Sequence, residues 1–294
     1  MSSLGTNGIL NPQGGAANFA LSRVAPAEDL AQLVERYWLV RWDLRGRPGY
    51  AQETLSYPCV NLVIGTHRPG VFGPVTRRFT AELAGLGWVV GAKFRPGAFA
   101  AFSDAPAIAL VDQSRQLGEL FGPAGYALTR AVHDELDDPA RIAHVEAFLR
   151  AHRRPIARDA IEVARVVGLA EAEPAIARAA DLADRAGLPL RALERLFRRH
   201  VGLPPKTVIR RFRVQEAAAR VAAGAAITWT ELAHELGYCD QAHFIREFKA
   251  QLGRTPTQYA AWCAASQGGV ASAPTSTPSF AASARVAAAD PQRT

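Results

Sequence analysis

The chain has 294 residues, 49% of them hydrophobic, and its 34 Lys and Arg against 27 Asp and Glu give a net charge of +7. An apolar fraction near one half excludes a wholly disordered protein, and the length suits two domains. Every apolar run is interrupted by charge, Gly or Pro, and the amino-terminal segment lacks a basic stretch followed by an apolar one, so we expect a cytoplasmic protein with no membrane partner.

The first half of the chain predicts a β domain. Residues 1–17 are rich in Gly, Asn and Ser and are expected to be frayed. The sequence YWLVRWDL, which begins at residue 37, alternates with a period of two and places Trp38 and Trp42 on one side of a strand and Arg41 on the other. Further short apolar runs bounded by Gly or Pro occupy residues 59–64, 71–75 and 87–94. The pattern predicts a small antiparallel sandwich or barrel.

Helices are predicted after this domain, because apolar residues recur there at spacings of three and four. The segments with this pattern are 113–121, 125–136, 141–152 and 158–167. The last residues are mostly Ala, Ser, Thr and Pro, too weakly apolar to fold. We therefore expect an α+β protein with four parts: a β-rich effector-binding or dimerisation domain (18–124), a helical connector (125–174), an all-α domain (175–263) and a disordered tail (264–294).

The positive charge is concentrated in one part of the chain. Residues 175–263 hold 14 Lys and Arg against 8 Asp and Glu, and 12 of those 14 cations are arginine. The planar guanidinium suits phosphates and guanine edges better than the ammonium of lysine. This segment is therefore the candidate for contact with nucleic acid.

The same local pattern occurs twice in this segment. In the first copy a short helix, AADLADRAG, ends at Gly187, which suits the left-handed turn at a helix end, and a second helix begins near Pro189. Leu193 and Phe197 face inward in that second helix. Its outer face then carries Arg191, Glu194, Arg195 and Arg198.

In the second copy Thr228 and Glu231 form a capping box that opens the helix WTELAHEL. Asp240 then caps a second helix, in which Phe244 and Phe248 face inward. Two helices joined by a short Gly-containing turn, with a polar and basic outer face on the second, are the helix-turn-helix pattern. An Arg-rich helix from about residue 205 to 221 links the two copies.

This segment resembles the DNA-binding domain of the AraC/XylS family of bacterial transcription regulators. The second motif, ITWTELAHELGYCDQAHFIREFKAQLGRTPTQY, carries the family pattern at Leu232, Ala233, Gly237, Tyr238, Phe244, Phe248, Gly253, Thr255, Pro256 and Tyr259. The first copy matches a looser pattern at Leu193, Arg195, Phe197, Gly202, Pro205 and Arg213. Pro189 departs from the usual Ser cap, and Ala242 and Ile245 offer no hydrogen bonds. These departures affect the base preference rather than the fold.

The resemblance implies a regulator that binds double-stranded DNA, with two motifs on one rigid helix entering successive major-groove turns about 34 Å apart. In the first motif Arg191 and Arg195 are the expected base contacts, and Arg198 and Arg199 the expected phosphate contacts. In the second motif we expect Gln241 to contact adenine or another base edge that mixes donors and acceptors. Ala242 and Ile245 are expected to contact thymine methyl groups, and Arg246 a base or a phosphate. Weaker phosphate candidates are Lys206, Arg210 and Lys249.

The amino-terminal part is similar to the cupin-like domain that many members of this family place before the DNA-binding domain, where it senses a small effector or dimerises. Four aromatic residues are the candidates for contact with an apolar or aromatic effector, unless they are simply the core of the β domain: Trp38, Trp42, Tyr57 and Trp88. The alternative is a domain that only dimerises. Expected partners are thus an effector, a second copy of the chain, and RNA polymerase if the protein is an activator.

Two enzymatic alternatives find little support. A cupin-type metal site needs several histidines, but the predicted β segment holds one of the seven and no HxH pair. A methyl-transfer repair protein needs a reactive cysteine, but Cys59 lacks a flanking His and Arg, and Cys239 and Cys263 are far from it in sequence. No nucleotide-binding or hydrolase motif is present. We expect no catalytic residue, no metal and no cofactor.

Overall fold

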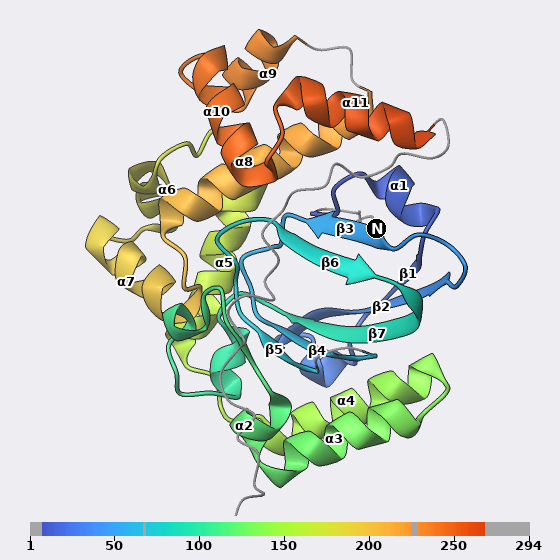
Figure 1. Cartoon of the computed structure of the whole chain (residues 1–294). Helices are drawn as coiled ribbons and strands as arrows, with labels where there is room; N and C mark the ends of the chain where they lie inside the picture. Colours follow the sequence, from blue (N-terminus) through green and yellow to red (C-terminus); the bar gives the residue numbers. More distant parts are fainter. Residues whose placement is uncertain (1–7, 67–68, 225–227, 268–294) are drawn as a thin grey trace, which may run out of the picture.

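The structure is a computed structural model that describes residues 8–66, 69–224 and 228–267. A β-rich part lies beside a helical part, and the long helix α8 (Pro205–Ala222) runs along the boundary between them (Figure 1). Within the described residues, no helix is long and apolar enough to cross a lipid bilayer.

The β-rich part consists of two antiparallel sheets. The larger sheet has the strand order β1-β2-β7-β4-β5-β8, and β3 pairs with β6 in the smaller one. The strands are β1 (Ala20–Val24), β2 (Val34–Leu44), β3 (Tyr50–Thr54), β4 (Asn61–Gly65), β5 (Gly70–Phe72), β6 (Phe79–Leu83), β7 (Gly85–Phe94) and β8 (Ser114–Arg115). Strands β1 and β8 leave the larger sheet open at both edges, so the domain is a sandwich and not a closed barrel.

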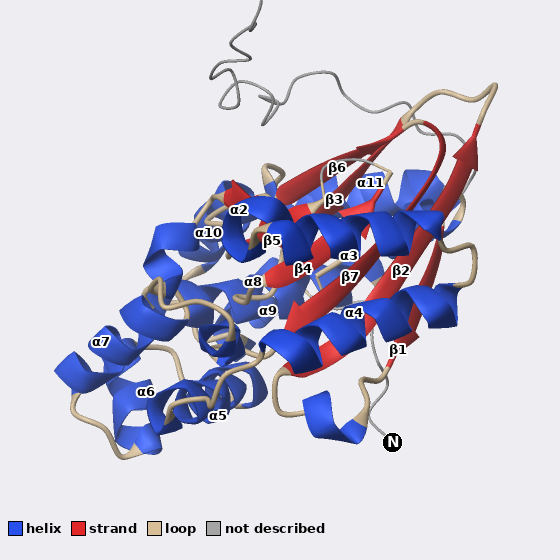
Figure 2. Cartoon of the chain, turned by 90° about the horizontal axis from the view of Figure 1, so that it is seen from below, coloured by secondary structure: helices blue, strands red, loops and turns tan. Residues whose placement is uncertain are grey.

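The predicted alternation along β2 is confirmed, and it explains how the larger sheet is covered on both faces. Tyr37 and Leu39 point to one face, where they join a core with helices α3 (Pro123–Asp134) and α4 (Asp138–His152). Trp42 and Leu44 point to the other face, toward Leu83 of the small sheet. Figure 2 shows α3 and α4 lying across their face of the sheet. The result is three layers, namely small sheet, large sheet and helix pair.

The predicted helix at 113–121 is wrong in its first residues, because Ser114 and Arg115 pair with β5 as strand β8. Helix α2 follows at Leu117–Phe121.

The helices of the predicted connector pack on two different cores: α3 and α4 lie on the sheet, whereas α5 (Arg158–Ala172) contributes Val163 and Val167 to a core of the helical part. The division of the chain into four parts stays a prediction. Short 3-10 turns are η1 (Glu28–Leu30), η2 (Ala98–Ala101) and η3 (Ala107–Leu110).

The helical part contains two small cores joined by α8. Val208 and Phe212 of α8 belong to the first core, and Val214 and Val221 to the second. Each turn of α8 thus buries side chains in one of the two units that it connects. The other helices are α6 (Ala179–Ala186), α7 (Leu190–His200), α9 (Trp229–Glu235), α10 (Gln241–Leu252) and α11 (Pro256–Gln267).

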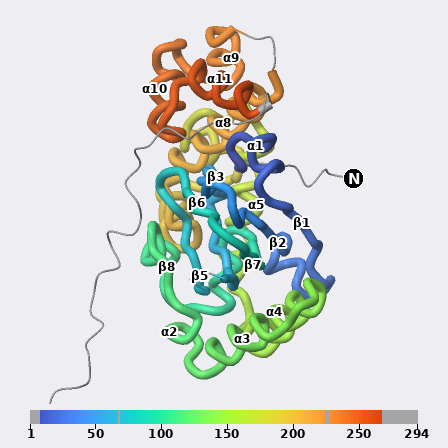
Figure 3. The backbone as a smooth tube through the Cα atoms, turned by 45° about the vertical axis from the view of Figure 1, so that its right-hand side comes forward, coloured from blue at the N-terminus to red at the C-terminus, as the bar shows by residue number. Residues whose placement is uncertain are grey.

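The expectation that residues 1–17 are frayed is wrong for residues 9–16. Leu10 is 2% exposed and belongs to the core of the second helical unit, and helix α1 (Pro12–Ala16) lies beside α11 (Figure 3). The backbone N–H of Asn11 donates to the hydroxyl of Tyr259 at 3.2 Å. Packing of Leu10 in this core therefore orders a segment whose composition alone gives no such signal.

The predicted tail begins too early, because α11 continues to Gln267. Its last turn gains a contact with the amino-terminal segment, where the amide of Asn11 donates to Ser266. The rest of the predicted tail, from residue 268, lies outside the described residues.

The contact between the β-rich and helical parts includes a buried guanidinium. Arg211 of α8 is 1% exposed, and it donates to the carbonyls of Ser56 and Thr76 at 3.0 Å each. Burial lowers the pKa of Arg211 to about 10. Gln215, one turn later, donates to the carbonyl of Leu55 at 2.6 Å. The loop between β3 and β4 is thereby held against α8.

Replacing Arg211 by Met should lower the free energy of unfolding by about 1 to 3 kcal/mol, because two carbonyls at the domain contact lose charged donors. Urea denaturation followed by circular dichroism measures this change. The matched control is Arg198→Met, an exposed arginine of α7, which should change the unfolding free energy by less than about 0.5 kcal/mol. Equal effects of the two substitutions would contradict the proposed importance of the buried contact.

Candidate nucleic-acid interface

The first helix-turn-helix motif forms as predicted from its sequence. Helix α6 ends at Gly187, whose φ of 71° lies in the left-handed region. Helix α7 begins after Pro189, and its residues Leu193 and Phe197 are fully buried. Because Arg191, Arg195, Arg198 and Arg199 are all exposed, the surface of this helix is strongly basic.

The second motif also matches the prediction. The backbone N–H of Thr228 donates to Glu231 at 3.0 Å, and the backbone N–H of Glu231 donates to the Thr228 hydroxyl at 3.2 Å. Asp240 caps α10 by accepting from the backbone N–H of His243 at 2.6 Å. Phe248 and Phe244 are fully buried beneath the helix. Capping therefore fixes where both helices of this motif begin.

The two candidate recognition helices are α7 and α10, and α8 holds both. Figure 1 shows α7 and α10 on the same side of the molecule, with α6 between them. Arg210 of α8 binds Glu247 of α10, with Nε and Oε2 3.1 Å apart. Arg220 of α8 bridges Glu216 of the same helix and Glu235 of α9. These ion pairs tie the second motif to the connecting helix.

Most of the predicted DNA contacts are exposed and free of protein partners. Within the described part of the chain, none of their side chains makes a hydrogen bond or an ion pair, and each is exposed to solvent. These residues are Arg191, Arg195, Arg198, Lys206, Ala242, Arg246 and Lys249. Free, exposed cations on a helix surface are available to phosphates and base edges.

Four other predicted contacts have partners within the protein. Arg210 is half-buried in its ion pair with Glu247, so it is not a free cation. Arg199 lies 3.9 Å from the carboxylate of Asp159 and faces the β-rich part. Ile245 is half-buried and packs on the core of the second unit, and Gln241 accepts a hydrogen bond from Thr230. The partners of these residues come from distant segments, which explains why sequence spacing did not reveal them.

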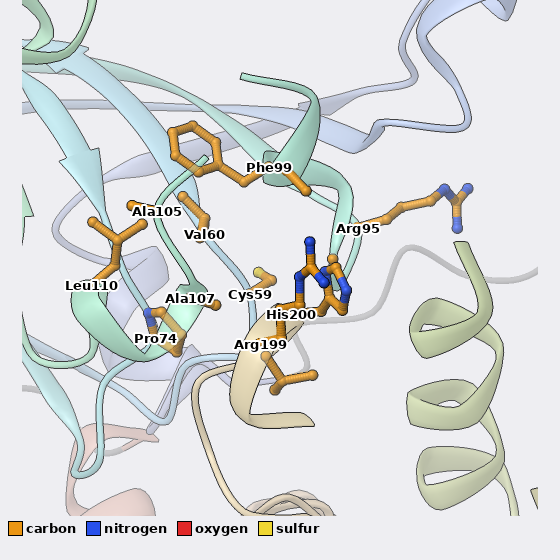
Figure 4. Close-up of a pocket in the computed structure, with 13 residues that line it drawn as sticks. Cys59, Val60, Pro74, Arg95, Phe99, Ala105, Ala107, Leu110, Arg199 and His200 are labelled. Atoms are coloured by element: carbon orange, nitrogen blue, oxygen red, sulfur yellow. The ribbon is translucent and has the colours of Figure 1, made fainter. Parts of the chain in front are cut away.

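A small cavity separates α7 from the β-rich part (Figure 4). Its volume is ≈ 20 Å³, which suffices for about one water molecule and not for an organic effector. Cys59, Arg199 and His200 lie on its wall. His200 is buried and its Nε2 lies 2.9 Å from Asp159 of α5. This pair lowers the pKa of Asp159 and joins the end of α7 to α5.

The four aromatic residues predicted to surround an effector do not lie together. Directly paired residues of an antiparallel sheet share a face, and Trp88 pairs with Arg41, whereas Trp38 and Trp42 have the opposite parity along β2. Trp88 therefore points toward α3 and α4, where the guanidinium of Arg141 stacks on its ring at 3.7 Å. Trp38 and Trp42 point toward the small sheet.

Tyr57 lies apart from all three tryptophans. Its hydroxyl donates to Glu171 of α5 at 2.8 Å, its ring centre is 5.3 Å from that of Phe212 of α8, and Nζ of Lys93 lies over the ring, 3.7 Å from its centre. Tyr57 thus belongs to the contact between the two parts of the protein. The alternation of strand residues could have separated Trp88 from the other tryptophans, but no sequence signal placed Tyr57 against α5 and α8.

Comparison with known proteins identifies two regions. A family model described as a helix-turn-helix domain matches residues 182–261, and a domain of unknown function, DUF6597, matches residues 22–116. The HTH-type transcriptional activators RhaS of Pectobacterium carotovorum and Pectobacterium atrosepticum are 36% and 35% identical over 75 residues, which is 26% of this chain and 26% of each relative. The chain thus matches about a quarter of the length of these curated relatives.

Two solved structures are similar to parts of the chain. A transcriptional regulator from Chromobacterium violaceum with an AraC-type DNA-binding domain is 23% identical, with 35% of this chain and 92% of that chain covered and a TM-score of 0.33. ToxT from Vibrio cholerae is 10% identical, with coverages of 83% and 98% and a TM-score of 0.39. The assignment of residues 182–261 rests on the sequence match and on the two motifs described above. Residues 182–261 therefore form a helix-turn-helix domain, in keeping with the resemblance of their sequence to the AraC/XylS family.

Proposed function

We propose that this protein is a sequence-specific DNA-binding regulator of transcription, with double-stranded DNA as its partner. The family of residues 182–261 supports this proposal, and so do the names of the relatives, which are transcriptional activators. Activation would add RNA polymerase as a second partner.

One observation carries the proposal: two helix-turn-helix motifs are fixed to one helix, and each exposes unpaired cations. Arg191, Arg195 and Arg198 extend from α7, and Arg246 and Lys249 extend from α10. Phosphate contacts by such cations supply affinity, and contacts of guanidinium groups with guanine edges supply sequence preference.

Selection of bound fragments from random duplexes by the full chain tests the proposal. Two motifs in successive major-groove turns should select a site in which two conserved segments lie about 10 base pairs apart. Affinity should fall steeply as salt rises, because each neutralised phosphate releases counterions. Recovery of duplexes without any common sequence would refute sequence-specific binding.

Arg195→Ala should weaken binding to the selected site by about 1 to 3 kcal/mol, because a bidentate contact to guanine is lost. Binding to an unrelated duplex should weaken much less. Fluorescence anisotropy with both duplexes at one salt concentration measures the difference. The control is Arg130→Ala, which removes the same charge from the exposed surface of α3. An equal loss on both duplexes would make Arg195 a phosphate contact only.

We further propose that the β-rich part controls DNA binding through a small effector. In support, the loop between β3 and β4 contacts α8 through Arg211, Gln215 and Tyr57, so a shift of this loop would move the helix that carries both motifs. A hollow at the β2–β7 pair is lined by Arg41 and Trp88 from one face of the sheet and by Trp42 from the other, and this hollow is the candidate effector site.

The alternative for the β-rich part is a domain that only dimerises. A thermal-shift screen with apolar and aromatic compounds, combined with DNA binding in their presence, distinguishes the two. Stabilisation together with altered DNA affinity supports effector control. Full DNA affinity with no stabilising compound, in a protein that sediments as a dimer, supports dimerisation alone.

The enzymatic alternatives receive no support from the residues that the structure describes. Among them, no three His, Cys, Asp or Glu side chains lie together as a metal site would require. Alkyl transfer needs a thiolate, but Cys59 is buried, and burial raises its pKa to about 12. Burial raises the pKa of Cys263 as well. Cys239 is exposed in the turn of the second motif.

These environments predict the reactivity of the three thiols. At pH 8 the folded protein should react rapidly with a thiol reagent such as dithionitrobenzoate at Cys239 alone, because only its thiol is exposed. Cys59 and Cys263 should react after unfolding in guanidinium. Cys239→Ser should abolish the rapid phase. Rapid modification of Cys59 in the folded protein would restore the repair alternative.

A further inference from the structure

The side chain of Gln241 is held by a neighbouring helix. Gln241 is the first residue of α10, directly after the capping residue Asp240. The first residues of a recognition helix are those that contact base edges. Thr230, the second residue of α9, donates from its hydroxyl to Oε1 of Gln241 at 2.7 Å.

We propose that Thr230 is a positioning residue that fixes the amide of Gln241 and thereby determines which bases the second motif accepts. This inference rests on the proposed function. An amide that reads adenine uses both ends, since its oxygen accepts from N6 and its nitrogen donates to N7. A Gln241 whose oxygen is held by Thr230 presents its NH₂ group to the groove instead.

The consequence is a preference for base edges that offer acceptors. Guanine offers N7 and O6, and thymine offers O4, whereas adenine places an amino group beside N7 and would oppose the NH₂ of Gln241. Two of its neighbours on α10, Ala242 and Ile245, are apolar and offer no competing hydrogen bond. Gln241 therefore selects guanine or thymine at its position, and Thr230 enforces that choice.

Thr230 contributes little to the fold, which makes this role testable. Its side chain is exposed, and the packing between α9 and α10 is carried by buried Leu232, Ala233 and Phe244. Within the described residues, no other hydrogen bond connects a side chain of α9 with a side chain of α10. A substitution at Thr230 should therefore change base preference and leave the free energy of unfolding within the range of surface substitutions.

The experiment is selection from random duplexes with the full-length protein and three variants. Gln241→Ala identifies the position that this residue contacts, because the preference at that position is lost. At the same position, wild type and Thr230→Ser should select guanine or thymine over adenine. Thr230→Val, which keeps the shape and removes the hydroxyl, should accept adenine and lose about 3- to 10-fold of the discrimination, the effect of one hydrogen bond. All other positions should be unchanged.

Three outcomes would overturn the inference. One is wild-type protein that selects adenine at the position of Gln241, and another is Thr230→Val with the wild-type preference. The third is a Gln241→Ala variant that loses preference at no position. Each of them leaves the proposed function intact, because wild type still selects a sequence. A wild-type protein that selects no sequence would instead refute the proposed function itself.

Discussion

The arrangement of the molecule depends on the burial of α8 between the β-rich part and the two helical cores. Arg211 lies at the centre of this contact, with its guanidinium removed from water and bound to carbonyls of two loops. A buried charge without these acceptors would be strongly unfavourable, so the loops of the sandwich and the helix specify one another. The positions of both motifs relative to the β-rich part follow from this contact.

The arginines of the helical part fall into two groups with different roles. Those on α8 bind other groups of the protein. Arg213 donates to carbonyls near the end of α5, and Arg210 and Arg220 bind carboxylates of the second motif. Those on α7 remain free, apart from Arg199. Because α8 holds the motifs in place and α7 and α10 expose cations, arginine packs within the protein on one helix and stays free for the proposed contact with DNA on another.

Local signals in the sequence predicted the helical part well and the rest less completely. Glycine at a helix end and the Thr228–Glu231 capping box act within a few residues, and the bounds of α6 to α10 follow from them. Strands β1, β3 and β6 were not predicted, because their residues are polar or half-exposed and their sequences show no clear alternation of apolar and polar side chains. The partners of Arg199, Arg210 and Tyr57 come from elements distant in sequence, and no local pattern reports such contacts. For the same reason Thr230 could not be linked to Gln241 before their helices were placed.

The position of Leu10 has a consequence for how the protein reaches its native state. This residue completes a core whose other members, apart from Leu55, come from α8 to α11, and the neighbouring Asn11 bonds to Tyr259, 248 positions away in the chain. During synthesis the segment around Leu10 leaves the ribosome before α8 to α11, so its partners do not yet exist when it emerges. Closure of so long a loop is slow, so the final docking of this segment should be a late event in biosynthesis, after the sandwich has formed.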